Sequence, residues 1–464
     1  MDLGFETIGN ATLVAHDGGP VLVTDPWIDG SAYFGSWTRS HEVPQRQRDA
    51  IQGCRFVWIS HGHPDHLSVE SLERLRDKRI LLPDHVGGRV RGDLCELGFH
   101  VEVLPDRRWV ELSRRIRVQC IADWNQDAVL LVDLGGRLVV NLNDASDHGW
   151  GGHLRSTMRQ YRETYLLALS GYGDADMINF VDEHGRQILP PAAKRVPVGQ
   201  GLTRLVDHYQ ARFFVPFSSM HRYQRTDSDW ANAYVTPIAD HAKGFASRSC
   251  EMLPAFIRRD LARDDLERID PPLAPIAPRD PREFGDDWSE TLAPEEAREV
   301  EAYFRAFEHL RGILGFVTFR VGGRDTRIEL NSRLSSKGIT FEVPRGSLLA
   351  AVRWQVFDDL LIGNFMRTRI HGDLGERPLY PDFSPYVAKY GDNGRARTER
   401  ELRAYFAAYR RRDPLGYLRA RVDTRLVLPL QERVSRLLRD HIGARSPVFR
   451  TAREAYWAVR RIAG

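Results

Sequence analysis

One short segment constrains this chain more than any other. Residues 56–60, Phe-Val-Trp-Ile-Ser, have the composition of a buried strand and run directly into His61-Gly62-His63-Pro64-Asp65-His66. Side chains that leave a strand end in a tight turn can converge on one point, and imidazole and carboxylate groups are usual ligands of zinc, iron and manganese. Three histidines and an aspartate within six residues are costly to place together unless a cation neutralises and orients them. The segment therefore predicts a metal site at the tip of a strand.

The first half of the chain is rich in short strands. Residues 69–77 and 152–162 have the apolar spacing of helices. This mixture is typical of an α/β sandwich whose outer faces are covered by helices. Apolar, β-branched or aromatic runs bounded by Gly, Asp, Asn or Pro predict strands at residues 12–16, 21–24, 55–60, 116–122, 128–134, 138–142, 165–170 and 213–217.

The length of 464 residues indicates two packed units. Residues 270–278, Asp-Pro-Pro-Leu-Ala-Pro-Ile-Ala-Pro, cannot continue a helix or a central strand. We therefore expect a catalytic domain at residues 1–250, a Pro-rich linker or crossover at 251–290, and a C-terminal α+β accessory domain at 291–464. Within the last of these, the pattern predicts a helix at 294–310, a hairpin at 315–321 and 326–330, and basic helices near 398–412 and 424–442.

Composition excludes several other classes of protein. The 66 basic and 63 acidic side chains are nearly balanced, so no clustered basic excess predicts a nucleic-acid partner. The four cysteines lie far apart, which argues against a disulfide framework or a zinc ribbon. No window approaches the roughly 18 apolar residues of a membrane span, and the first residues lack the pattern of a signal peptide. We expect a cytoplasmic protein that does not interact with membranes.

The spacing His61-x-His63-x-Asp65-His66 after a strand resembles the metal-binding signature of the metallo-β-lactamase superfamily. The resemblance implies an αβ/βα sandwich with two metal ions at its edge. It also implies that His61 and His63 hold the first metal, and that Asp65 and His66 hold the second.

Three further positions follow from the same resemblance. Asp144, at the end of the run 140–144, resembles the carboxylate that bridges the two metals, and His221, after the strand at 213–217, resembles the last ligand of the second metal. Asp25, after the strand at 21–24, resembles an early carboxylate that orients a metal ligand from outside the centre.

One position departs from the common pattern. Most members of the superfamily place a further histidine before the bridging aspartate, and residues 118–125 contain none. Asp123 is the best substitute, with Asp127 as a weaker one, although an ordinary loop aspartate is the competing interpretation. Two imidazoles and a carboxylate resemble the ligand set of non-haem iron, which favours iron or manganese over zinc. Such a set also lowers the Lewis acidity that hydrolysis requires.

Four segments resemble the catalytic region of the CMP-N-acetylneuraminate hydroxylase group: residues 25–37, 141–144, 213–221 and 358–364. The carboxylate at Asp123 is also similar to that of a di-iron β-hydroxylase of antibiotic biosynthesis with the same fold. Both resemblances imply oxygen activation at iron. The CMP-sialate hydroxylases carry a Rieske domain, whose ligation needs paired Cys and His at short spacing, and no cysteine here has that context. An oxygenase would therefore need an external reductant.

Two chemistries remain open for a pair of divalent metals. The favoured one is O2-dependent hydroxylation, at two irons, of a small molecule or a sugar-nucleotide-like substrate. The alternative is a zinc or manganese hydrolase that attacks an ester, amide or phosphodiester, with Asp65 or Asp144 orienting the nucleophile and accepting its proton. A metal-stabilised scaffold without activity is the third interpretation.

Other polar and aromatic residues are weaker candidates for contact with substrate or with the metal ligands. The loop that contains Trp27 should lie near the metals, although its aromatic residues more often pack than bind. His148 follows Asp144 closely, but an exposed loop histidine is the competing interpretation. Tyr172 and Asp174 follow a predicted strand and are candidates to line the pocket.

Overall fold

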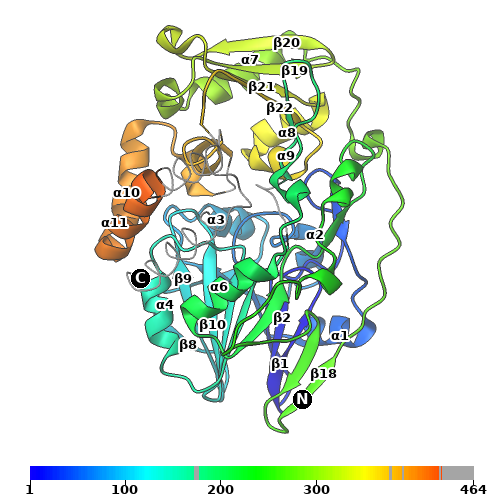
Figure 1. The fold of residues 1–464 in the computed structure, drawn as a ribbon, viewed down its shortest axis with the longest axis vertical. Helices are drawn as coiled ribbons and strands as arrows, with labels where there is room; N and C mark the ends of the chain where they lie inside the picture. The colour runs from blue at the N-terminus through cyan, green and yellow to red at the C-terminus, as the bar shows by residue number, and fades with distance from the viewer. Residues whose placement is uncertain (172–176, 376–378, 389–390, 428–429, 431–464) are drawn as a thin grey trace, which may run out of the picture.

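The computed structural model describes residues 1–171, 177–375, 379–388, 391–427 and 430. Its lower half is a sandwich of two β-sheets, and a third sheet lies above it (Figure 1). The eight-stranded sheet has the order β18 (Asp265–Arg268), β17 (Ile257–Asp260), β1 (Leu3–Ile8), β2 (Thr12–Asp17), β3 (Pro20–Thr24), β5 (Phe56–Trp58), β6 (Arg79–Pro83), β7 (His100–Leu104). The seven-stranded sheet has the order β16 (Glu251–Met252), β14 (Phe213–Phe217), β12 (Thr164–Leu169), β11 (Leu138–Asn143), β10 (Ala128–Leu134), β9 (Ile116–Ala122), β8 (Trp109–Glu111).

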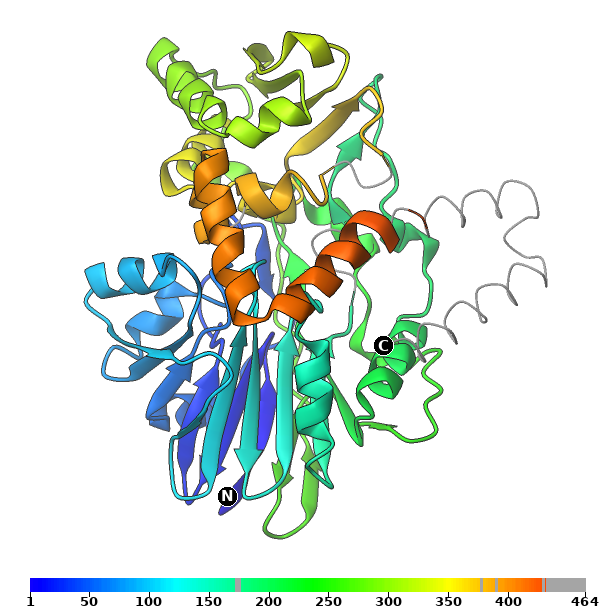
Figure 2. The same cartoon turned by 90° about the vertical axis from the view of Figure 1, so that its left-hand side faces the viewer.

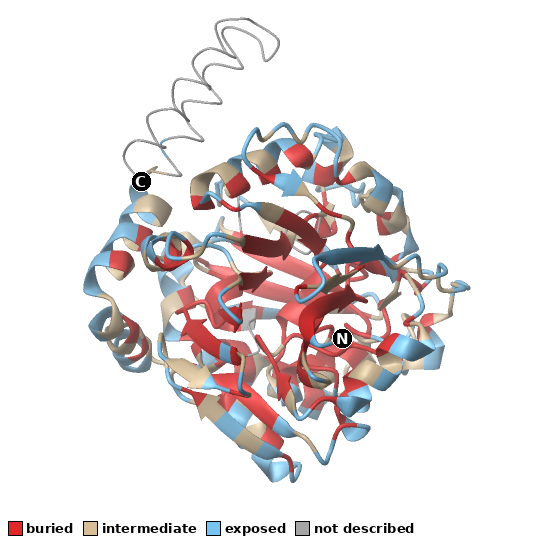
Figure 3. Ribbon diagram, turned by 90° about the horizontal axis from the view of Figure 1, so that it is seen from below, coloured by how far each residue is buried: buried red, intermediate tan, exposed pale blue. Residues whose placement is uncertain are grey.

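The two sheets pack face to face because their strands carry apolar residues on the inner side. Phe5, Leu13, Leu130, Val132 and Leu167 belong to one buried cluster that draws on both sheets. Figure 3 shows these strands as a buried centre ringed by partly exposed helices. The sandwich expected from the sequence is thus confirmed.

Helices cover both outer faces of the sandwich. The parallel strands β3, β5, β6 and β7 need crossover connections, which put helices on the outside of the first sheet. The second sheet has parallel pairs at β11–β12 and β12–β14 and is covered in the same way. The covering helices are α1 (Gln45–Gly53), α2 (Val69–Glu73) and α3 (Arg89–Glu96) on the first sheet, and α4 (Gly151–Met158) and α6 (Gly199–Tyr209) on the second.

A third sheet is built mainly by the last part of the chain. Its order is β13 (Phe180–Val181), β22 (Arg367–His371), β21 (Gly338–Glu342), β19 (Phe316–Val321), β20 (Arg324–Glu329). The predicted hairpin is β19–β20, and its two-residue turn places Gly322 and Gly323 at positive φ, as such a turn requires. We call β19 to β22 and the helices that follow Leu292 the C-terminal unit. These helices are α7 (Pro294–Arg305), α8 (Arg345–Trp354), α9 (Asp358–Ile362), α10 (Glu399–Arg412) and α11 (Pro414–Val422).

The C-terminal unit lies above the sandwich. Its helices α10 and α11 lie on the left of the molecule in Figure 1 and face the viewer in Figure 2. Tyr405 of α10 donates a hydrogen bond to the carbonyl of Trp124, and the Val86 amide donates to Tyr409 Oη over 3.1 Å. A capping box of Thr398 and Glu401 begins α10 within one residue of the predicted start. The predicted helix at 424–442 falls mostly outside the described residues.

The pairing of strands crosses the predicted domain boundaries. The hairpin β17–β18 lies beyond residue 250 yet extends the first sheet, while β13 lies before it and pairs with β22 of the C-terminal unit. The division at 250 and 291 stays a prediction. Among the described helices, none has both the length and the apolar character needed to cross a bilayer.

Candidate metal centre

The turn with three histidines lies where parallel strands of the first sheet end. β5 is flanked by β3 and β6, and the chain turns sharply after Ser60. The amide of His66 donates to the carbonyl of His63 over 3.0 Å, which closes a tight turn. His61, His63 and His66 are all buried, and His61 Nε2 lies 2.9 Å from His63 Nδ1. The turn therefore gathers the imidazoles as the sequence predicted.

Each of the three histidines also has a nitrogen that faces a polar group outside the turn. His61 Nδ1 lies 2.9 Å from Ser60 Oγ. His66 Nδ1 lies 3.0 Å from Asp25 Oδ2, and His63 Nε2 lies 2.8 Å from Asp358 Oδ2. A hydrogen bond to one nitrogen of an imidazole fixes the tautomer and leaves the other nitrogen free for a metal.

Asp25 stands at the end of β3 and is fully buried. It accepts hydrogen bonds from the Ser60 amide over 2.8 Å and from Ser60 Oγ over 2.7 Å, besides its contact with His66. Burial raises the pKa of this carboxyl. Its contacts are those expected of a carboxylate that orients a metal ligand from outside the centre.

Two carboxylates converge on the inner nitrogen of His66. His66 Nε2 lies 3.4 Å from Asp65 Oδ2 and 3.3 Å from Asp144 Oδ2, and within the described chain it has no aligned hydrogen-bond partner. Burial opposes the charged form of His66, but Asp65, Asp144 and Asp25 together raise its pKa well above the ordinary value. His66 Nε2 and the two carboxylate oxygens thus face one another, but no aligned hydrogen bond joins the nitrogen to either oxygen. A cation placed among these three atoms would satisfy them.

Neighbouring side chains hold these two carboxylates in place. Tyr33 Oη donates to Asp65 Oδ1 over 2.6 Å, and Asn10 Nδ2 donates to Asp65 Oδ2 over 2.8 Å. Ser218, after β14, donates to Asp144. Burial opposes ionisation of Asp144, yet His66 holds its pKa below the ordinary range.

The donor atoms fall into two neighbouring groups. His61, His66 and Asp144 each offer one ligand atom, and these three atoms lie within 4.8 Å of one another. His63, Asp358 and Asp359 form a second such group. The first group consists only of residues that the sequence predicted, whereas the second adds two aspartates that it did not assign to the site.

His221 is held differently from the other histidines. It begins β15 (His221–Tyr223), which pairs with β4 (Trp37–Arg39), and its ring stacks on Trp37 with centroids 3.3 Å apart and planes 2° apart. Neither of its ring nitrogens has a hydrogen-bond partner in the part of the chain that is described. Burial lowers its pKa to about 3. Asn10 links it to the turn, because Asn10 Oδ1 accepts from the Met220 amide over 2.8 Å while Asn10 Nδ2 contacts Asp65.

Asp123 does not join either group of donors among the described residues. It follows β9, and it accepts hydrogen bonds from the Asn125 amide over 2.9 Å and from Trp150 Nε1 over 3.1 Å. Asp127, the weaker candidate, accepts from Asn125 Nδ2 over 2.8 Å. The assignment of Asp123 as a ligand stays a prediction.

Two of the remaining candidates, Trp27 and His148, lie in the described part of the chain. Trp27 is buried in an aromatic cluster with Tyr33, Trp37 and Tyr223, beside the turn. His148 is half-buried, with its ring 4.5 Å from that of Trp124. Tyr172 and Asp174 lie outside the described residues.

Asp358 and Asp359 are the site residues that the sequence did not identify. Both are buried in α9, and Oδ1 of each has no hydrogen-bond partner in the described structure. Burial, together with the charge of Asp358, raises the pKa of Asp359 well above its usual range. The sequence signal for them is the segment 358–364, whose resemblance to the hydroxylases does not by itself indicate a role for either aspartate.

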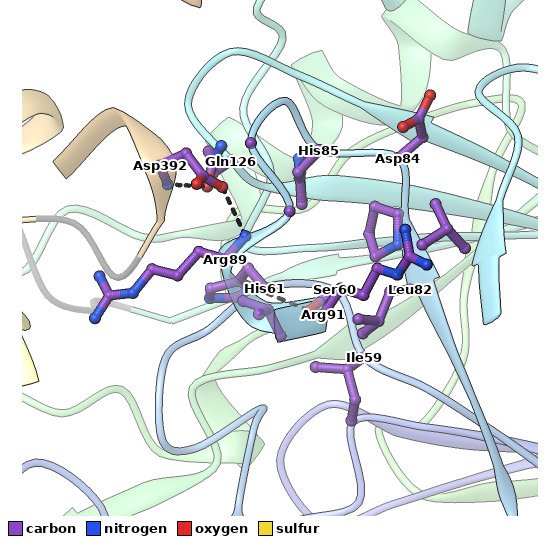
Figure 4. Close-up of a pocket in the computed structure, with 15 residues that line it drawn as sticks. Ile59, Ser60, His61, Leu82, Asp84, His85, Arg89, Arg91, Gln126 and Asp392 are labelled. Atoms are coloured by element: carbon purple, nitrogen blue, oxygen red, sulfur yellow. Dashed lines mark hydrogen bonds between the residues drawn. The ribbon is translucent and has the colours of Figure 1, made fainter. Parts of the chain in front are cut away.

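A pocket of about 430 Å³ opens beside His61. It lies between the strand ends of the first sheet, the start of α3 and the C-terminal unit, which contributes Asp392. Figure 4 shows Asp392 beside Gln126, whose Oε1 accepts from the Asp392 amide over 2.7 Å. Besides Asp392, the polar and charged side chains that line the pocket are Ser60, His61, Asp84, His85, Arg89, Arg91 and Gln126.

Comparison with known proteins agrees with this fold. Residues 21–132 match the family described as beta-lactamase superfamily domain. Cytidine monophosphate-N-acetylneuraminic acid hydroxylase of Sus scrofa is 25% identical over 206 residues, which cover 42% of this chain and 47% of that protein. The mouse enzyme is 26% identical over 207 residues, which cover 42% and 35%, and the human protein, named as inactive, is 25% identical over 207 residues, which cover 42% and 41%. The match thus spans less than half the length of these relatives.

Solved structures that match part of this chain include one named as a hydroxylase and one named as a hydrolase. CmlA, a diiron β-hydroxylase from Streptomyces venezuelae, is 16% identical, with a TM-score of 0.36 over 58% of this chain and 54% of its own. An isothiocyanate hydrolase from Delia radicum gut bacteria is 15% identical, with a TM-score of 0.35 over 55% and 97%. The names of the pig and mouse sequence relatives agree with the expectation of an enzyme.

Proposed function

We propose that this chain, whose residues 21–132 belong to the β-lactamase superfamily, is a non-haem di-iron enzyme that hydroxylates a small molecule with O2. The observation that carries the proposal is the excess of carboxylates around the three histidines. Asp65 and Asp144 both meet His66. Oxygen donors of this kind favour iron or manganese over zinc. The sequence relatives that are named as hydroxylases support the same choice.

The residues present fit two metal ions. His61 and His63 would hold the first, Asp65, His66 and His221 the second, and Asp144 would stand between them. Within the described chain, the inner nitrogen of His66 and both nitrogens of His221 lack hydrogen-bond partners, and this occupancy would satisfy the first and one of the other two. Asp123 is proposed as a further ligand of the first metal. Two irons held there would supply the activation of O2.

The chain itself orients the ligands and admits the substrate. Tyr33 and Asn10 each occupy one oxygen of Asp65, so this carboxylate has a fixed orientation. Asp144 has a side chain that is 31% exposed, against 2% for Asp65. Asp144 is therefore the more accessible of these two carboxylates, and we assign it, with Asp65, to proton handling in the reaction.

The small-molecule substrate is assigned to the pocket beside His61. Arg89 and Arg91 both line this pocket, although Arg89 is already committed to the carbonyls of Trp354 and Gln355. Among the described residues that line the pocket, Arg91 is the second arginine, and we assign it to an anionic group of a sugar-nucleotide-like substrate. The guanidinium groups point to opposite sides in Figure 4.

The reaction needs electrons that the chain does not carry. Hydroxylation of a C–H bond consumes one O2, two electrons and two protons, and it yields the alcohol and one water. The four cysteines are single thiols, three of them buried, so they offer no paired site for a redox cluster. We therefore propose an external reductant as the partner.

The metal content and the optical spectrum of the purified protein test this proposal. Two irons per chain, a visible absorption band and O2 consumption that depends on a reductant would support it. Two zinc ions per chain, no visible band and cleavage of a chromogenic ester or phosphodiester would overturn it in favour of the hydrolase.

A further inference from the structure

The C-terminal unit reaches into the candidate metal centre through one short helix. Asp358 is the first residue of α9, and its Oδ2 lies 2.8 Å from Nε2 of His63, which is 295 positions earlier in the chain. The side chains of both residues are at most 8% exposed. This contact is thus a buried link between two parts of the chain that the fold brings together.

The geometry of His63 indicates what this link does. The two nitrogens of an imidazole point in different directions, so they cannot both bind the same ion. His63 Nδ1 faces Nε2 of His61 at 2.9 Å, which makes Nδ1 the nitrogen that can share a metal with His61. Nε2 is then left to carry the proton, and Asp358 is placed to accept it in a hydrogen bond.

The same arrangement occurs at His66 with a carboxylate from the sandwich. There Nε2 faces Asp65 and Asp144, while Nδ1 faces Asp25 at 3.0 Å. Asp358 thus contacts one nitrogen of His63 and leaves the other for a metal, in the same way that Asp25 contacts one nitrogen of His66. The difference is that Asp25 ends a strand of the sandwich, whereas Asp358 belongs to the C-terminal unit.

Several hydrogen bonds hold the segment 358–364 in this position. Ser36 Oγ donates to the carbonyl of Gly363 over 2.6 Å, and Trp230 Nε1 donates to the carbonyl of Asn364 over 3.2 Å. Asn364 Nδ2 donates to Tyr223 Oη over 3.0 Å. All five residues of α9 are buried. The carboxylate is therefore anchored on the side of the site that also contains His221.

We propose that Asp358 is a positioning residue of the metal centre, which fixes the tautomer and orientation of His63 and makes metal affinity depend on the C-terminal unit. The inference rests on the dinuclear centre of the proposed function but not on which metal it holds or which reaction it performs. Removal of such an outer partner typically lowers metal affinity about 10–100-fold.

Binding of Co²⁺ to the full-length metal-free chain, measured by competition with a chelator and by the visible spectrum, tests this role. Asp358→Leu removes the acceptor, so we expect two ions per chain to be bound about 10–100-fold more weakly, with an altered cobalt spectrum. Asp358→Asn keeps an oxygen acceptor for Nε2–H, and we expect it to recover most of the affinity. A structural role alone would not be recovered in this graded way.

Asp286→Asn is the matched control. Asp286 is a buried carboxylate next to the C-terminal unit that contacts Arg225 and Ser347 and no histidine. We expect this change to lower thermal stability while the folded protein binds Co²⁺ within about threefold of the natural chain. Circular dichroism establishes that each variant is folded.

Three results would each overturn a different part of the proposal. Wild-type Co²⁺ affinity in Asp358→Leu would overturn the positioning role and leave the dinuclear centre standing. Loss of one whole ion per chain in both Asp358 variants would overturn it in favour of direct ligation by the group His63, Asp358 and Asp359. Absence of Co²⁺ binding in the natural chain would overturn the centre itself.

Discussion

The two sides of the candidate centre hold buried histidines in opposite ways. On the turn, the two nitrogens of His66 face three carboxylates, and its pKa is raised. On the other side, His221 lies flat against Trp37, both nitrogens lack hydrogen-bond partners among the described residues, and its pKa falls to about 3. One side is organised by charge and the other by packing. Substitutions that remove a carboxylate should therefore affect mainly the side with His66. Protonation should cost most on the side with His221.

The largest effect is expected from Asp144→Ala. This change removes the carboxylate that meets His66 Nε2 and that belongs to the donor group with His61. Because the loss of an outer partner already costs about 10–100-fold, we expect metal affinity to fall by more than about 100-fold. Metal content after dialysis against a graded chelator measures it.

Asp147→Ala is the control for that change. Asp147 accepts hydrogen bonds from the amides of Gly149 and Gly151 at the start of α4, over 2.8 and 3.0 Å. Its removal should lower stability by about 1 kcal/mol and leave metal retention unchanged. Equal metal retention by the Asp144 and Asp147 variants would contradict the assignment of Asp144.

Asp25→Asn should have the next largest effect. Asp25 contacts His66 Nδ1 and accepts two hydrogen bonds from Ser60, so neutralising it weakens the orientation of His66. We expect metal affinity to fall about 10–100-fold. Asp17→Asn, at the opposite end of the neighbouring strand β2, should leave affinity unchanged, and an equal loss in both variants would point to a general effect on folding.

The pH dependence of stability distinguishes the two histidines by sign. Between its folded pKa of about 3 and its ordinary value of 6.5, His221 is neutral in the folded chain and protonated in the unfolded one. It should therefore destabilise the metal-free protein as pH falls below 6.5, by up to about 1.4 kcal/mol per pH unit. His66 has a raised pKa, so the stability it contributes below pH 6.5 should be lost as pH rises above that value.

Urea midpoints of the metal-free protein from pH 5 to pH 9 measure both effects. His221→Leu should flatten the acidic side of the profile, and His66→Gln should flatten the alkaline side. An acidic slope that survives His221→Leu would show that burial of this imidazole is not its source.

Ser60→Ala should have the smallest effect. Its Oγ donates to Asp25 over 2.7 Å and lies 2.9 Å from His61 Nδ1. The loss of one such hydrogen bond costs about 1 kcal/mol, or about fivefold in affinity, because the backbone amide of residue 60 still holds Asp25. Isothermal titration with metal measures it, and a loss as large as that of Asp25→Asn would assign the orientation of the turn to the hydroxyl.

The sequence predicted those features that local patterns encode. The strands at 116–122 and 128–134 have the predicted bounds, because both are rich in apolar and β-branched residues and end at turn residues. The histidine turn was recognisable because its donors are contiguous. The hairpin β17–β18 fell in the predicted linker instead, since β18 is a fully exposed edge strand of mostly charged residues and carries no apolar signal.

The rest of the site depends on contacts between distant parts of the chain. Whether Asp123 faces a metal or a tryptophan depends on where Trp150 packs, and the strand pattern does not contain that information. The role of Asp358 depends on a five-residue helix that meets a turn almost 300 residues away in sequence. Residue spacing identified the strand that ends in candidate ligands, but not the partner of each one.

The two-residue strand β13 has a practical consequence for anyone who divides this protein. Phe180 and Val181 belong to the first half of the chain, yet they pair with Thr368 and Arg369 at the edge of the third sheet. Expressing residues 1–290 and 291–464 as separate polypeptides would leave β22 with a row of unpaired amides and carbonyls, which is a template for aggregation. The two halves should therefore be produced together, and co-expressed fragments should be recovered as one complex.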